Sequence, residues 1–117
     1  MEYSQSRLPK LRQRLGEAED TLYEAEASGD EAKIAKAKLR VAEAKLGVAE
    51  AELGVAKASG DESKIADAKL GVAKAELGVA EAKLGVAEAS GDEAKIAEAK
   101  LVVSALTRQI YGSCALA

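Results

Sequence analysis

ASGDEAKIA, at residues 27–35, is a nine-residue phrase that occurs three times in this chain. Its other copies, ASGDESKIA and ASGDEAKIA, lie at residues 58–66 and 89–97, so that successive copies are 31 residues apart. Gly is preferred just beyond a helix end, because it adopts the left-handed conformation without a Cβ clash. Asp is a strong cap for the first N–H groups of the next helix. Each copy therefore predicts a short turn between two helices. The predicted turn residues are Gly29, Asp30, Gly60, Asp61, Gly91 and Asp92.

The phrase could instead lie inside one continuous helix that tolerates glycine. The phase of the repeat argues against this, because a step of 31 residues at about 100° per residue turns the pattern by roughly 220°. An apolar stripe would then move to the far side of the helix at every copy. The sequence therefore predicts four helices, at about residues 7–28, 31–59, 62–90 and 93–111, with a loose tail at 112–117.

Between the turns runs a seven-residue phrase close to LGVAEAK, which gives each middle helix a stripe of Leu and Ala. Leu39, Leu46 and Leu53 follow one another at steps of seven, as in the seam of a coiled coil. We expect an all-α fold in which residues 1–117 form a single helical domain. It would be an antiparallel up-down-up-down four-helix bundle, or a layered array of helical hairpins with coiled-coil-like Leu/Ala seams.

The start of the first helix is predicted from Pro9. Proline suits the first turn of a helix, where its missing N–H costs nothing. Residues 1–6 show no apolar pattern and are expected to be frayed.

The middle helices and the fourth helix carry a second apolar face, made of Val, Ala and Gly, opposite the Leu/Ala stripe. A surface helix normally has one apolar stripe, so a helix with two is expected to be covered on both sides. We therefore predict that this second face forms an interface. Its predicted interface residues are Val41, Val48, Val55, Val72, Val79, Val86, Val103, Ile110, Gly47, Gly54, Gly71, Gly78 and Gly85.

The glycines of this face have two interpretations. Each costs roughly 0.8–1 kcal/mol relative to Ala in a helix interior. They could permit close approach of another backbone, or they could be unselected copies made when the repeat was duplicated.

Charged residues border the two apolar faces. Folding the two middle helices about Gly60 and Asp61 brings these charges into seven predicted pairs, of which five attract. The same folding of the first hairpin pairs Arg12 with Glu50. An exposed pair contributes only about 0.2–1 kcal/mol, so the charges would set register more than stability.

Composition and charge exclude several classes of protein. The 17 basic and 20 acidic residues are interleaved and give a net charge of −3, without the basic face that nucleic acid needs. The mixed charges beside the apolar faces also argue against a membrane surface. There is no His, and Cys114 is the only cysteine, so neither a zinc nor an iron–sulfur site is expected. A single cysteine forms no internal disulfide, which favours a reducing compartment.

No signature of a catalytic site, a cofactor site or a small-molecule site is found in the sequence. No apolar run reaches transmembrane length, and the first residues lack the apolar core of a secretory signal. We expect a non-enzymatic structural or scaffold protein that forms a homo-oligomer, or docks a helical protein partner, through its second face. Two alternatives stay open: a stress-protection or lipid-surface amphipathic-helix protein, and a designed or artificial repeat bundle.

Overall fold

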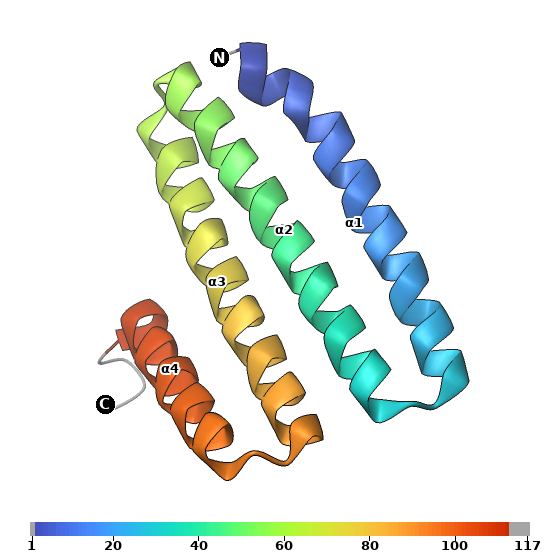
Figure 1. Ribbon diagram of the computed structural model, residues 1–117. Helices are drawn as coiled ribbons and strands as arrows, with labels where there is room; N and C mark the ends of the chain where they lie inside the picture. The colour runs from blue at the N-terminus through green and yellow to red at the C-terminus, as the bar shows by residue number, and fades with distance from the viewer. Residues whose placement is uncertain (1, 113–117) are drawn as a thin grey trace.

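The computed structural model describes the backbone of residues 2–112 and the side chains of residues 7–112. Within this range the chain forms four α-helices: α1 (Glu2–Ser28), α2 (Glu31–Ser59), α3 (Glu62–Ser90) and α4 (Glu93–Tyr111). Figure 1 shows that they run alternately up and down, so that each helix is antiparallel to its neighbour. The predicted all-α class is confirmed. Of the predicted tail, Gly112 ends α4 with a φ of +54°, and Cys114 lies outside the described residues.

The three turns share one backbone geometry. Gly29, Gly60 and Gly91 have φ values of +74°, +73° and +75°, in the left-handed region that favours glycine. The Asp that follows each glycine caps the next helix. Asp61 Oδ1 accepts hydrogen bonds from the backbone N–H of Ser63 at 3.0 Å and of Lys64 at 3.2 Å. Local chemistry thus stops one helix and starts the next within two residues.

A serine completes each turn, and the sequence analysis did not assign it a role. Ser59 Oγ donates to the carbonyl oxygen of Ala56 at 2.6 Å and accepts from the backbone N–H of Asp61 at 3.2 Å. Ser28 and Ser90 make the equivalent bonds in the other two turns. The hydroxyl therefore links the last turn of one helix to the capping residue of the next.

Removal of one cap should be measurable. We expect Asp61→Ala to lower the free energy of unfolding by about 1 kcal/mol, because two N–H groups at the start of α3 lose their acceptor. Asp61→Asn keeps a side-chain oxygen and is the matched control, with little expected change. Urea unfolding followed by circular dichroism measures both variants. Equal midpoints for the alanine variant and the parent chain would show that the cap does not stabilise the fold.

Helix α1 begins earlier than the sequence analysis predicted. It starts at Glu2, so Pro9 lies inside the helix and the prediction that Pro9 occupies the first turn is wrong. The prediction rested on Pro9 and on the lack of an apolar pattern in residues 1–6. Residues 2–7 include Glu, Gln and Arg, which are good helix formers without being apolar. Helix propensity therefore extends α1 to the residues before Pro9, although Pro9 offers no N–H to the preceding turn.

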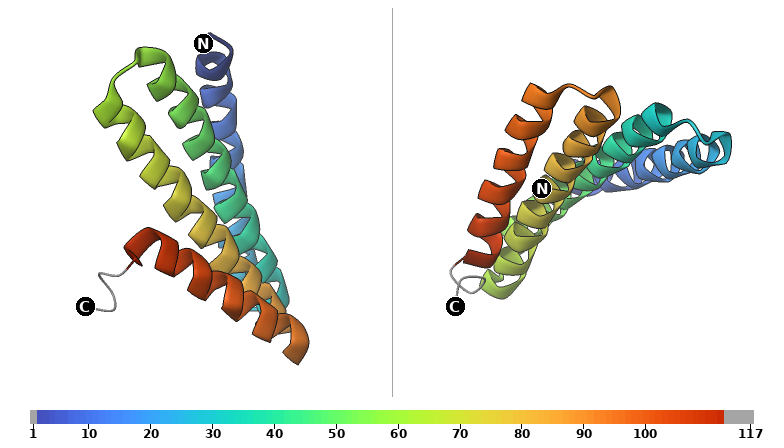
Figure 2. Two further views of the ribbon diagram at one scale, coloured as in Figure 1. Left: turned by 90° about the vertical axis from the view of Figure 1, so that its left-hand side faces the viewer. Right: turned by 90° about the horizontal axis from the view of Figure 1, so that it is seen from below.

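The helices form one layer. In the described part of the chain, α1 packs against α2, α2 against α3, and α3 against α4, with no contact between helices that are not consecutive. A closed bundle would also bring α1 against α4. The principal extents are 46 × 40 × 19 Å, and the shortest is less than two helix diameters of about 10–12 Å. Figure 2 shows that the layer is twisted, so that α1 and α4 run in different directions. The four packed helices therefore adopt the layered arrangement.

The core of the layer is thin. None of the large side chains in the described range is fully buried. Leu77 and Ala80 come from the Leu/Ala stripe, whereas Ala37 and Val41 come from the second face. Residues of both apolar faces of the middle helices are thus buried inside the chain. The buried residues are Ala37, Val41, Ala56, Leu77, Ala80 and Ala87.

Candidate functional site

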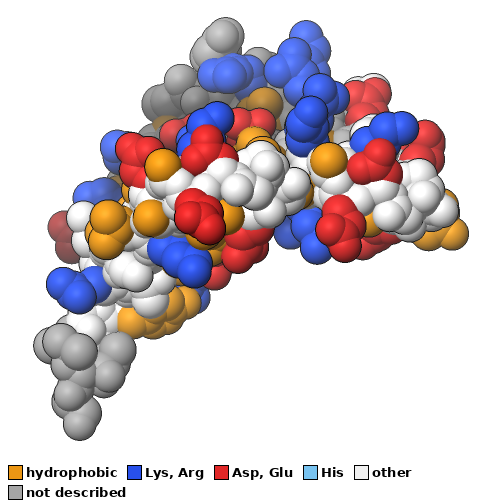
Figure 3. Space-filling model, turned by 60° about the horizontal axis from the view of Figure 1, so that its bottom comes forward, with side chains coloured by type: hydrophobic (Ala, Val, Ile, Leu, Met, Phe, Trp, Pro, Cys, Tyr) orange, Lys and Arg blue, Asp and Glu red, His pale blue; other side chains and the backbone are white. Residues whose placement is uncertain are grey.

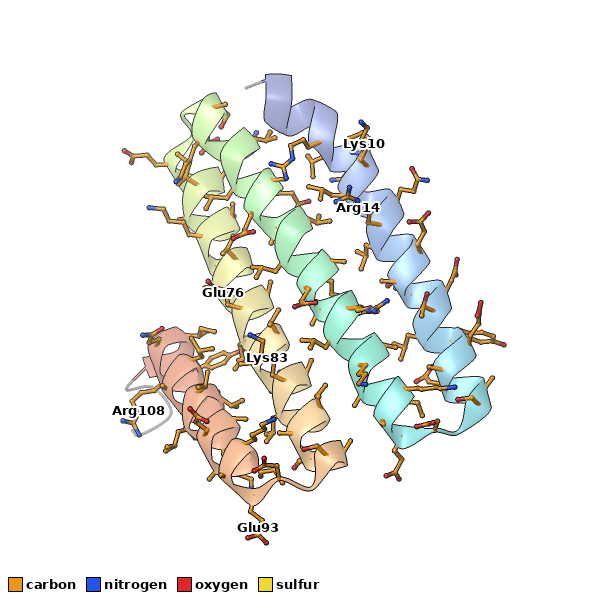
Figure 4. The ribbon with its side chains drawn as sticks, viewed as in Figure 1. Lys10, Arg14, Glu76, Lys83, Glu93 and Arg108 are labelled. Atoms are coloured by element: carbon orange, nitrogen blue, oxygen red, sulfur yellow. The ribbon has the colours of Figure 1, made fainter. Side chains whose placement is uncertain are left out.

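A groove runs along the contact between α3 and α4 and has a volume of ≈ 480 Å³. Most of its lining is apolar. Four charged side chains also line it, two from α3 and two from α4, with one acid and one base on each helix. Figure 4 shows Glu76 and Lys83 on the side of α3 that faces α4. We call this feature the α3–α4 groove. Its lining residues are Glu76, Val79, Ala80, Lys83, Val86, Ala87, Ser90, Lys95, Glu98, Ala99, Val102 and Leu106.

Both apolar patterns of the sequence contribute to the α3–α4 groove. Val79 and Val86 belong to the predicted second face, and Ala80 and Ala87 to the Leu/Ala stripe. The turn at Gly91 folds α4 back along these residues, so Val102 and Leu106 form the opposite side. The arrangement offers an apolar trough with charges of both signs, which suits an apolar surface with a mixed-charge border.

The other two hairpins have equivalent grooves, shifted by 31 residues, with different linings. Arg40 of the α1–α2 groove corresponds to Gly71 of the α2–α3 groove and to Val102 of the α3–α4 groove. In the same way, Glu24 of the first groove corresponds to Val86 of the third. The last groove is therefore apolar at positions where the first is charged. A position-by-position comparison of the three copies would have revealed this difference in the sequence.

The predicted interface residues do not form one open surface. Val41 is buried, whereas the other predicted valines and Ile110 are half-buried. Val79 and Val86 line the α3–α4 groove, and Val55 lines the α2–α3 groove. Neighbouring helices of the same chain thus cover part of the predicted face. Part of what stays accessible lies in the grooves.

The space around four of the predicted interface glycines is open. A Cβ added at Gly71, Gly78 or Gly85 would meet no atom within 4 Å, and one added at Gly47 would lie 3.7 Å from Leu11 Cδ2. Gly71 is exposed, and the other predicted glycines of the face are half-buried. At these four positions no backbone of the same chain makes the close approach that would require glycine.

The predicted charge pairs are wrong. Arg12 Nη2 lies 3.3 Å from Glu52 Oε2, not from Glu50, and none of the seven predicted α2–α3 pairs forms an ion pair in the described part of the chain. The prediction assumed that α2 and α3 present the same borders to each other. Instead, Lys38 of α2 and Glu81 of α3 line the same two grooves. Each middle helix presents different sides to its two neighbours, so the charged residues that meet differ from those in the predicted pairs.

The two edges of the layer differ. From residue 7 onward, the exposed residues of α1 are polar or charged, apart from Pro9, Tyr23 and Ala27. Helix α4 instead exposes Leu101, whose exposed fraction is 71%, and Val102, whose exposed fraction is 49%. This exposure is not expected from the sequence, in which Leu101 repeats Leu70 of the Leu/Ala stripe 31 residues later. Figure 3 shows apolar side chains between charges of both signs on one face of the molecule.

The described residues offer neither a metal-binding cluster nor a membrane-spanning helix. No group of three or more His, Cys, Asp or Glu side chains there could hold a metal ion. No helix in that part of the chain combines the length and the apolar character needed to cross a membrane. None of the half-buried or buried side chains of residues 7–112 leaves a buried polar atom without a hydrogen bond.

The α3–α4 groove and the adjoining edge of α4 thus place accessible apolar surface side by side. Accessible apolar surface of this kind commonly marks an interaction site. Comparisons with protein-family models, with curated proteins and with solved structures find no match to this chain.

Proposed function

We propose that this chain is a non-enzymatic structural module that docks an amphipathic helix of a protein partner in the α3–α4 groove. The observation that supports the proposal is the difference between the grooves: Val86 and Val102 line the third, where Glu24 and Arg40 line the first. When a partner covers apolar side chains that line an open groove, their removal from water lowers the free energy of the complex.

The shape of the groove favours a helical partner. Glu76 lies at one end of its α3 side. The other lining residues of α3 extend from Val79 to Ser90, a length of about 16 Å at 1.5 Å per residue. An amphipathic helix would place anchors at positions i, i+3 or i+4, and i+7 along this length. Lys83 and Lys95 could meet acidic residues at the border of such a helix, and Glu76 and Glu98 could meet basic ones. The charges of both signs thus match a helix with a mixed-charge border, such as the helices of this chain.

The proposal can be tested with a labelled peptide that has the sequence of Glu31–Ser59 as the probe. We expect fluorescence anisotropy to show saturable binding to the full chain. Val102→Arg should weaken the binding at least about tenfold, because it removes an apolar anchor worth about 1.4 kcal/mol or more and fills the groove with a charged side chain. The arginine is expected to be tolerated by the fold, since Arg40 occupies the equivalent position in the first groove.

Gly71→Arg is the matched control, because it introduces the same arginine at the equivalent position of the α2–α3 groove. Gly71 is exposed and has open space around its Cβ position. This variant should bind the probe as the parent chain does. An absence of binding to the parent chain, or equal loss in both variants, would contradict docking in the α3–α4 groove.

A further inference from the structure

We infer that two copies of this chain associate along the outer face of α4, antiparallel and about a two-fold axis. This surface lies on the edge of the layer, beside the α3–α4 groove, so the inference goes beyond the proposed docking of a helix in that groove. Figure 1 shows α3 on one side of α4 and, among residues 2–112, no helix on the other. Each middle helix has a helix on both sides, and a second copy would give α4 the neighbour that the layer lacks.

The outer face of α4 is apolar at its centre. Its residues follow one another at steps of three and four, which places them on one side of a helix. All of them are exposed, and Leu101 lies in the middle with small side chains before and after it. Small neighbours allow a second helix to approach Leu101 closely. The face consists of Ala94, Ala97, Leu101, Ser104, Ala105 and Arg108.

The charges of α4 indicate the direction of pairing. Residues 92–98 hold three acids and one base, a net charge of −2, whereas residues 99–111 hold two bases and no acid, a net charge of +2. An antiparallel pair of α4 helices places each acidic half beside a basic half, and a parallel pair would place like charges together. Antiparallel helix dipoles also attract. Complementary halves of this kind specify both the partner and its direction.

A two-fold axis near Leu101 gives specific charge pairs. Glu93 lies eight residues before Leu101 and Arg108 lies seven residues after it. In the antiparallel pair, Glu93 therefore lies within about 1.5 Å, along the helix axis, of the level of Arg108 of the partner subunit. Figure 4 shows Arg108 projecting from α4 away from α3, and Glu93 projecting from the start of α4. Symmetry repeats the pair, so the interface contains it twice.

The opposite edge of the layer does not suit α4. A head-to-tail contact would place the outer face of α4 on α1, whose exposed residues are almost all polar or charged. Such a contact would remove charges from water without apolar gain. A head-to-tail contact would also leave an unpaired edge at each end of the assembly, so that further copies could add without limit. The two-fold pair joins one apolar face to another and closes.

Sedimentation equilibrium of the full chain tests the inference. A single pair of helices is a small interface, so we expect a dimer with a Kd of about 1–100 µM. Leu101→Glu should raise the Kd at least about tenfold, because two carboxylates would face each other at the two-fold axis. Leu101 is exposed, so the fold should persist, and circular dichroism verifies this.

Leu70→Glu is the matched control, since Leu70 occupies the equivalent position 31 residues earlier and its exposed fraction is 45%. It should dimerise as the parent chain does. A monomeric parent chain at several hundred micromolar, or an equal effect of both substitutions, would overturn the inference. Neither result concerns the binding of the Glu31–Ser59 peptide, so the two proposals can fail separately.

Charge exchange tests the direction. Glu93→Arg and Arg108→Glu should each weaken the dimer about three- to tenfold, because each single change places like charges together twice. The double variant exchanges both charges and should restore the parent Kd, as in a double-mutant cycle. If the double variant lost as much dimerisation free energy as the two single variants together, that result would exclude the antiparallel pair.

Discussion

Replacing Gly71, Gly78 and Gly85 together by alanine is expected to raise the free energy of unfolding by about 2–3 kcal/mol, the sum of three gains of roughly 0.8–1 kcal/mol. All three lie inside α3, where glycine adds freedom to the unfolded chain and gives no packing in return. A Cβ at each position would meet no atom within 4 Å, so the added methyl groups cause no clash. Thermal unfolding should show a rise in midpoint of roughly 8–15 °C.

The turn glycine provides the opposing control. Gly60 has a φ of +73°, and Gly60→Ala should lower stability by about 1 kcal/mol or more, because alanine is strained in the left-handed region. The sign of the change thus depends on backbone conformation and not on residue type. If the triple variant proved no more stable than the parent chain, these glycines would have to make a close contact that a single chain does not contain. That result would favour the first of the two interpretations drawn from the sequence.

The turns could be predicted from the sequence because their chemistry is local. The left-handed conformation of Gly60 and the capping by Asp61 depend on three or four neighbouring residues. The extension of α1 to Glu2 was missed because Pro9 was taken to mark the first turn and residues 1–6 show no apolar pattern. A helix can continue past its stripe when its residues have sufficient propensity.

The packing could be predicted only in part. The two apolar faces of α2 and α3 correctly indicated helices that are covered on both sides. The sequence did not show which face meets which helix, because the 31-residue step rotates the pattern while each turn reverses the chain. The resulting pairing of unlike sides explains why Arg12 meets Glu52 instead of Glu50. It also places Leu101 at the edge of the layer, although its pattern matches that of the half-buried leucines of α2.

The candidate groove depended on differences between copies of a repeat. Repetition made Val, Ala and Gly look equivalent in every copy. The useful signal was the change from Arg40 to Gly71 to Val102 at one repeated position, which alters the groove without altering the fold. In a repeat protein, the residues that all copies share therefore predict the architecture. The residues that differ between copies predict candidate sites.

The thin core concentrates stability in a few side chains, and Leu77 is the largest of them. Its exposed fraction is 8%, and the other buried side chains are alanines and Val41. We expect Leu77→Ala to lower the free energy of unfolding by about 2–3 kcal/mol, from lost apolar burial and an incompletely filled cavity. The value lies at the low end for such a substitution, because none of the large side chains in the described range is fully buried and the neighbours can relax.

Leu70→Ala is the matched control, seven residues earlier on the same helix, with an exposed fraction of 45%. It should lower stability by less than about 1 kcal/mol, because much of its side chain stays in water in the folded state. Urea unfolding of both variants gives the comparison, with equal slopes required before the midpoints are converted into free energies. Equal losses at the two positions would contradict the difference in burial between Leu77 and Leu70. A larger loss at Leu77 would show that stability depends on the few side chains that the layer buries.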